Sequence, residues 1–91
     1  MVFLKENLTG DHYHWLGQFK NPEISTAPDR HFFDRTDGNQ ILNLINYFGN
    51  YVDKLTIAYG QNIELLLSKE LPAQIKSEIA AFNWLKGVYL Y

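Results

Sequence analysis

The stretch TDGNQILNLINYFGN, residues 36–50, decides the fold class of this chain. Its large apolar residues repeat at the spacing of one helix face, and they are Ile41, Leu42, Leu44, Ile45 and Phe48. Asp37 precedes them as an N-cap, and Gln40 three residues later completes a capping-box pattern. Gly49-Asn50 supplies a stop signal. The stretch therefore predicts a helix over residues 38–49.

The dipeptide Asp37-Gly38 also suits the turn of a β-hairpin. A hairpin strand would need apolar and polar residues to alternate from Asn39 onward. The adjacent pairs Ile41-Leu42 and Leu44-Ile45 break that alternation. The helix is therefore the better interpretation of this stretch.

The C-terminal half predicts two further helices. Residues 51–60 are ambiguous, because their apolar positions fit either a continued helical face or an alternating strand. A helical stripe then predicts a helix over residues 58–70, and Pro72 suits the first turn of another helix over residues 73–86. Gly87 is expected to end that helix, and the apolar tail GVYLY, residues 87–91, favours a strand.

The N-terminal part, residues 1–36, shows no long helical pattern. Short strands are expected around HYHWL, residues 12–16, and RHFFD, residues 30–34. At 91 residues the chain is expected to form one small globular domain, with residues 37–91 as its helical part. The predicted fold is mostly α, with about three helices packed against an aromatic-rich, irregular or short-stranded N-terminal segment. The alternative is an α+β protein with a small antiparallel sheet.

Composition argues against several classes of function. The net charge is −2 and no run of Lys or Arg provides a basic patch, so nucleic-acid binding is not expected. No window approaches the roughly 18 apolar residues that cross a bilayer, so no membrane partner is expected. The chain has no cysteine, and Lys5 and Glu6 leave no room for a signal-peptide core in MVFLKENLTG. We therefore expect a cytoplasmic protein.

Three histidines define a metal-binding alternative. In an extended segment His12 and His14 project from the same side, and two imidazoles at that spacing can ligate one zinc or similar ion. His31 or a nearby aspartate would supply a third ligand. The competing interpretation is that these are ordinary loop histidines, hydrogen-bonded to aspartate or solvated.

The segment DRHFFDRTD, residues 29–37, is the main candidate for an interaction surface. It gathers arginine, histidine and two phenylalanines just before a helix, and both Phe and Arg are enriched in protein interfaces. The competing interpretation is that one or both phenylalanines enter the core while the charged residues pair and cap the helix. The candidate interaction residues are Trp15, Arg30, His31, Phe32, Phe33 and Arg35.

Four asparagines of the first predicted helix recur at three- and four-residue spacing, and they are Asn39, Asn43, Asn46 and Asn50. This pattern indicates a neutral, solvated helix face. A hydrogen-bonding interface is the alternative interpretation.

The sequence offers no clear catalytic motif, because no serine lies in a nucleophile-elbow context and the six glycines form no phosphate loop. No enzyme activity and no cofactor are therefore expected. Two tryptophans, six tyrosines and six phenylalanines are more rings than three short helices readily bury. We therefore expect a small acidic protein with a non-catalytic interaction or regulatory function, whose partner is another protein or a second copy of itself. The alternative function is a metal- or small-ligand-binding domain organised by His12, His14 and His31.

Overall fold

The computed structural model describes residues 2–15 and 25–90 of the chain. The described part is mostly helical and contains no β-sheet. Its elements in chain order are a short 3₁₀ turn η1 (Lys5–Asn7), the helices α1 (Gly38–Val52) and α2 (Ile57–Leu65), a π-helical turn η2 (Leu66–Glu70) and the helix α3 (Glu78–Leu90). The prediction of a mostly α fold with three helices is confirmed.

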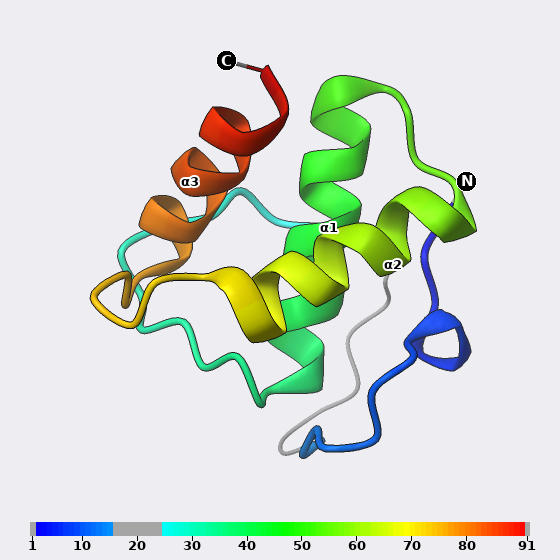
Figure 1. The fold of residues 1–91 in the computed structure, drawn as a ribbon, viewed down its shortest axis with the longest axis horizontal. Helices are drawn as coiled ribbons and strands as arrows, with labels where there is room; N and C mark the ends of the chain where they lie inside the picture. Colours follow the sequence, from blue (N-terminus) through cyan, green and yellow to red (C-terminus); the bar gives the residue numbers. More distant parts are fainter. Residues whose placement is uncertain (1, 16–24, 91) are drawn as a thin grey trace.

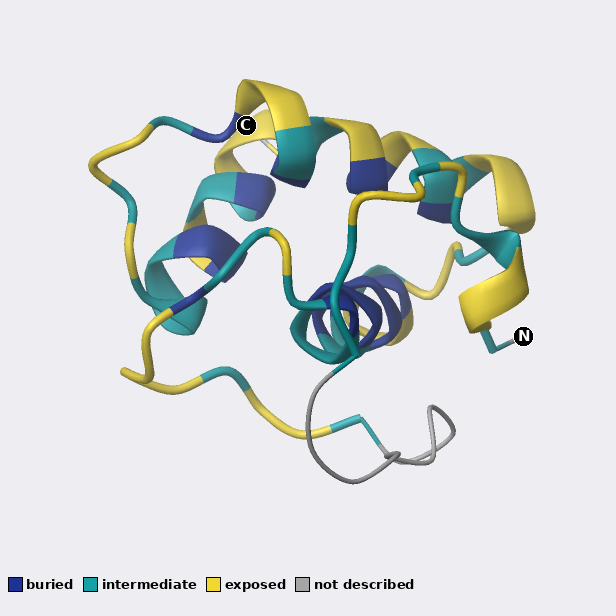
Figure 2. Cartoon of the chain, turned by 90° about the horizontal axis from the view of Figure 1, so that it is seen from below, coloured by how far each residue is buried: buried dark blue, intermediate teal, exposed yellow. Residues whose placement is uncertain are grey.

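Helix α1 forms the centre of the molecule. Helix α2 crosses α1, and α3 packs beside α1. The N-terminal segment runs on the side of α2 opposite α3 (Figure 1). Figure 2 looks along α1 and shows that the buried residues of the three helices face one another. The five apolar residues that predicted α1 are all buried, with Ile41 and Ile45 completely inaccessible to solvent. The helical spacing in residues 36–50 therefore identified the main wall of the core.

The start of α1 agrees with the prediction in its cap but not in its capping box. The Asp37 carboxylate accepts hydrogen bonds from the backbone N–H of Asn39 at 2.9 Å and of Gln40 at 3.4 Å. The Gln40 side chain does not bond back to Asp37. Its Oε1 accepts from the backbone N–H of Asp34 at 2.8 Å, and its Nε2 donates to the Phe32 carbonyl at 2.7 Å. Gln40 therefore fixes the loop before the helix.

The predicted ends of α1 and α3 are wrong by several residues. Helix α1 continues past Gly49-Asn50 to Val52 and ends at Asp53, whose φ of 56° gives a left-handed cap. Pro72 does not begin α3. The Ser77 hydroxyl accepts a hydrogen bond from Ala80 N at 3.2 Å, and the helix starts at Glu78.

The tail is helical to Leu90 and is not a strand. Tyr89 packs on Phe48 at 5.5 Å and on Tyr59 at 5.0 Å between ring centroids. Its hydroxyl also accepts a hydrogen bond from Asn62 Nδ2 at 2.7 Å. These contacts carry the helix through Gly87, which is why local propensity misplaced its end. Tyr91, the last residue of the tail, lies outside the described residues.

The two expected strands are reduced to single bridges. His14 bridges to Asp37 in parallel, and Phe32 bridges to Ser77 in antiparallel orientation. Neither pair extends into a ladder within residues 2–15 and 25–90, so the α+β alternative is wrong for this part of the chain. Leu16, the last residue of the HYHWL segment, lies outside the described residues.

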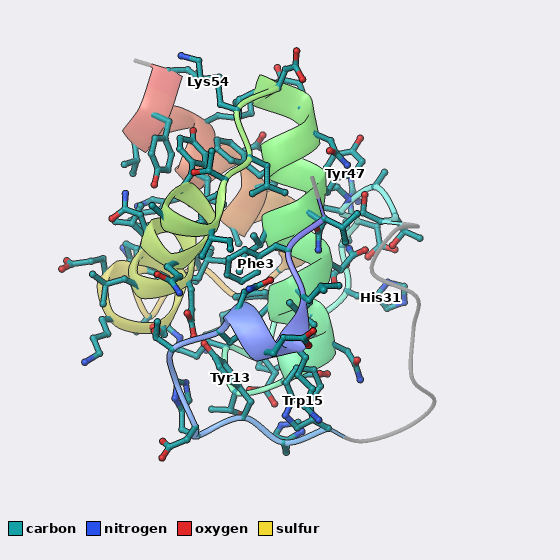
Figure 3. All side chains as sticks on the ribbon, turned by 90° about the vertical axis from the view of Figure 1, so that its right-hand side faces the viewer. Phe3, Tyr13, Trp15, His31, Tyr47 and Lys54 are labelled. Atoms are coloured by element: carbon teal, nitrogen blue, oxygen red, sulfur yellow. The ribbon has the colours of Figure 1, made fainter. Side chains whose placement is uncertain are left out.

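Two buried polar side chains attach the N-terminal segment to the helices. Asn46 accepts a hydrogen bond from Phe3 N at 2.8 Å and donates to Phe3 O at 2.9 Å, and this places the Phe3 ring in the core (Figure 3). Glu64 on α2 accepts hydrogen bonds from Thr9, Gly10 and Tyr13. The N-terminal segment is therefore part of the same core as the helices.

The predicted asparagine face of α1 does not behave as one solvated stripe. Asn46 is 2% exposed and is satisfied inside the molecule. Asn43 binds the backbone of Thr26 in both directions, with 2.7 and 3.1 Å separations. Asn50 is exposed. Two of the four asparagines, Asn43 and Asn46, therefore attach other segments to α1. No helix in the described part of the chain is long and apolar enough to cross a membrane.

Candidate interaction surface

Residues 29–32 form an exposed segment that we call the 29–32 surface. Two hydrogen bonds fix its backbone against the start of α3: Glu78 N to His31 O at 3.0 Å and Ile79 N to Asp29 O at 2.8 Å. The next residue is held by a bond from Phe33 N to Lys76 O at 2.8 Å, just before α3. The Gln40 side chain of α1 holds the Phe32 carbonyl from another direction. The segment is therefore irregular in shape but well anchored to two helices.

The two phenylalanines of this segment point in opposite directions. Phe33 is 4% exposed and belongs to the core, whereas Phe32 is 66% exposed. Successive side chains of an extended backbone alternate between its two faces, which explains the difference. Phe33 therefore holds the segment down and is not available to a partner. Phe32 remains as an exposed apolar side chain on a fixed backbone.

The other predicted interaction residues separate into two groups. Arg30 and His31 are exposed beside Phe32, and no side-chain partner of Arg30 occurs among the residues that the structure describes. Arg35 is half-buried, and its guanidinium donates to Pro72 O at 3.5 Å.

Trp15 lies away from the 29–32 surface, near the start of α1 (Figure 3). Its ring contacts Gly38, where an added Cβ would come within 2.4 Å of it. The Lys5 ammonium lies 4.4 Å from the ring centroid. Trp15 therefore serves packing within the chain, and the structure does not bring it together with Arg30, His31 and Phe32.

The described aromatic rings range from fully buried to exposed. Among the described rings, Phe32 at 66% and Tyr51 at 54% are the ones that are exposed. The buried rings are Phe3, Phe33, Phe48 and Phe82, and the partly buried ones are Tyr13, Trp15, Tyr47, Tyr59, Trp84 and Tyr89. Several rings are therefore at least partly exposed, as the aromatic content of this short chain suggested, and the two most exposed of the described rings lie on different parts of the fold.

The predicted metal ligands are not gathered in one place. His14 pairs with Asp34, with 3.1 Å between Nε2 and Oδ2, and the His12 ring lies on Tyr13 at 4.1 Å between centroids. His31 instead meets Asp29, with 2.5 Å between Nδ1 and Oδ1. Within the described residues, His12, His14 and His31 do not form a group that could hold an ion.

His31 belongs to a different group, together with Asp29 and Glu78. One ligand atom from each of the three lies within 4.8 Å of the others, and Glu78 is the first residue of α3. Burial and the nearby Asp29 carboxylate raise the pKa of Glu78. Hydrogen bonds from His31 lower the pKa of Asp29. Sequence reasoning missed Glu78 because it lies far from residues 29–32 along the chain.

Two of the serines, Ser68 and Ser77, have structural roles. Ser68 Oγ donates to Glu64 O at 2.9 Å, and Ser77 caps α3.

No family model, curated protein or solved structure matches this chain.

Proposed function

We propose that this chain is a non-catalytic protein–protein interaction domain that binds its partner through the 29–32 surface. The observation that carries the proposal is the exposure of Phe32 on a backbone held by both α1 and α3. The partner is another protein or a second copy of the chain. By covering a surface of its partner, the domain would act as a regulator. The cysteine-free composition supports a cytoplasmic location.

The fixed backbone of the 29–32 surface favours binding, because a mobile segment would have to become ordered when its partner binds. Ordering side chains and loops at an interface costs free energy, which a preorganised segment avoids. Binding energy in interfaces is concentrated in a few central residues, which are often aromatic or Arg. Phe32 with Arg30 beside it has this composition, and Phe33 and Gln40 maintain its position.

The charged residues around Phe32 would fix the orientation in which a partner binds. The Arg30 guanidinium is positive, whereas Asp29 and Glu78 form a carboxylate pair next to His31. Complementary charges across an interface chiefly fix orientation and favour the correct partner. We therefore expect the partner to present an apolar pocket for Phe32, with an acidic group near Arg30.

The test uses a photo-crosslinking phenylalanine analogue at position 32, with the same analogue at Leu65 as the matched control. Leu65 is an exposed apolar residue of α2, at 49%. Crosslinking at position 32 in living cells would yield one defined adduct, with a second copy or with another protein, and the control would not. Phe32→Ala should abolish the interaction without lowering the thermal midpoint.

Two results would reject this proposal. One is an absence of any specific adduct at position 32 while light scattering shows a monomer at all concentrations. The other is normal partner binding by both Phe32→Ala and Arg30→Ala. Either outcome would mean that the exposed ring has no binding role.

A second candidate function, binding of a divalent metal ion, is favoured by the Asp29–His31–Glu78 group. Imidazole nitrogen and carboxylate oxygen are ligands that zinc accepts. Stoichiometric metal in protein purified without chelator, lost in His31→Ala but kept in His12→Ala, would support it. No metal and no thermal shift with zinc, manganese or nickel would reject it.

A further inference from the structure

A hollow of about 360 Å³ opens where α1 ends, α2 begins and α3 ends. It lies at the end of the molecule opposite Trp15, as the position of Lys54 shows (Figure 3). Its lining residues are Tyr51, Val52, Lys54, Tyr59, Tyr89 and Leu90. The volume falls within the range of about 300–1,000 Å³ that is usual for small-ligand sites.

The tyrosines of this hollow are held by contacts with other residues. Tyr51 packs edge-on against Phe82 at 5.3 Å between ring centroids, and Tyr59 lies 5.0 Å from Tyr89. Tyr89 is further fixed by the hydrogen bond from Asn62. The aromatic walls are therefore formed before any ligand arrives. Offset or edge-on packing of one more aromatic ring against such walls is favourable.

The charged side chains at this hollow are positive. Lys54 is the charged residue of this lining, and it is exposed without an ion-pair partner among the described residues. The Lys86 ammonium adds a second positive charge 5.6 Å from the centroid of the Tyr51 ring. The neighbouring Asp53 is not in this lining and lines a separate hollow, which also includes Lys54. A ligand in the tyrosine-lined hollow would therefore meet aromatic rings and a positive charge.

We propose that the tyrosine-lined hollow binds a small aromatic carboxylate, with its ring against Tyr51, Tyr59 and Tyr89 and its carboxylate near Lys54. Tyrosine phenols, with an ordinary pKa of about 10, are neutral near pH 7 and do not repel the anion, and burial raises the pKa of Tyr59 and of Tyr89 further. One or two fused rings suit the volume. This site is separate from the 29–32 surface and does not depend on the proposed partner.

The probe is 1-naphthoate, titrated into the isotope-labelled full chain while amide chemical shifts are followed by NMR. A ligand of this size is expected to bind with a dissociation constant of about 1 mM or tighter. Shifts should concentrate at residues 51–55, 59 and 89–90. The matched neutral probe, 1-naphthylmethanol, keeps the ring system and lacks the charge.

The variant Lys54→Gln distinguishes a charged site from a merely apolar one. Because Lys54 is exposed, the variant should fold normally. It should weaken binding of 1-naphthoate by up to about fivefold, as expected for an exposed ion pair, and leave the neutral probe unaffected. Lys69→Gln, at an exposed position of η2, is the matched control and should bind both probes as the unmodified chain does.

Three results would overturn the inference. The first is an absence of shifts at the lining residues with several millimolar probe. The second is equal binding of the two probes that Lys54→Gln does not change. The third is a set of the same shifts on concentrating the protein alone, which would show that a second copy covers the hollow.

Discussion

Replacing Glu64 tests whether a buried carboxylate holds the N-terminal segment on α2. Glu64 is 2% exposed. Its two oxygens accept hydrogen bonds from Thr9 N at 2.9 Å, Thr9 Oγ1 at 3.0 Å, Gly10 N at 3.0 Å and Tyr13 Oη at 2.7 Å. A buried ionised group is tolerated only when it is hydrogen-bonded in this way. The four donors are therefore the reason that Glu64 can remain charged inside the fold.

The magnitude follows from these four bonds. A hydrogen bond to a charged group contributes about 1.5–3 kcal/mol, although water can replace some of the donors at this partly exposed segment. We expect Glu64→Gln to lower the free energy of unfolding by about 1.5 kcal/mol, since the glutamine amide nitrogen would face groups that donate. Glu64→Ala should cost about 3 kcal/mol, a large part of the roughly 5–14 kcal/mol available to a domain of this size.

The effect should depend on pH with a definite sign. Burial by itself raises the pKa of Glu64, but hydrogen bonds from Thr9, Tyr13 and Gly10 outweigh it, so the folded pKa lies below its ordinary value. A lowered folded pKa contributes stability above the unfolded value of about 4.3, and this stability is lost as the pH falls through the folded pKa. The difference between the unmodified chain and Glu64→Gln should therefore shrink in acid.

Urea unfolding followed by circular dichroism at pH 7 and at acidic pH measures this difference, and hydrogen exchange of the Gly10 amide reports on the attachment itself. Glu70→Gln is the matched control, because Glu70 is exposed and should change stability by less than about 0.5 kcal/mol. Equal stability of Glu64→Gln and the unmodified chain at pH 7 would refute the reasoning. So would a difference that keeps its full size in acid.

Three further substitutions test a close contact, an open helix position and a buried hydrogen bond. Gly60→Ala should destabilise the fold by about 1–3 kcal/mol, because the new Cβ would lie 2.2 Å from the Phe3 ring; thermal melting checks this. Gly87→Ala should stabilise it by about 0.5–1 kcal/mol, since nothing lies within 4 Å and alanine favours a helix; a lower melting temperature would contradict this. Asn46→Ala should cost about 2–3 kcal/mol by leaving the buried backbone of Phe3 unpaired, and the loss should appear as faster exchange of the Phe3 amide.

The core helix was readable from the sequence because its signals are local. The positions Ile41, Ile45 and Phe48 repeat at the helical period, and all three are completely buried in the structure. The Asp37 cap likewise needs only the next three residues. Helix periodicity and capping are set within one or two turns, so one sequence is enough to find them.

Tertiary structure decided the roles of the polar residues on the helices. Asn46 and Glu64 have ordinary surface character in the sequence, yet both are 2% exposed. Their partners lie 43 residues away for Asn46 and 51–55 residues away for Glu64. No local sequence pattern indicates these hydrogen-bonded pairs, because they form only when the N-terminal segment folds across α1 and α2.

The candidate site shows the same division. The sequence by itself determined that residues 29–33 would gather Phe, Arg and His before a helix, and it left open whether the phenylalanines face a partner or enter the core. Only the tertiary structure decided that Phe33 is the inner one and that Glu78 joins His31, because the loop is pinned to the start of α3 by backbone hydrogen bonds. Residue types and spacing are fixed by the chain, whereas which face of an extended segment is buried depends on what the rest of the molecule places against it.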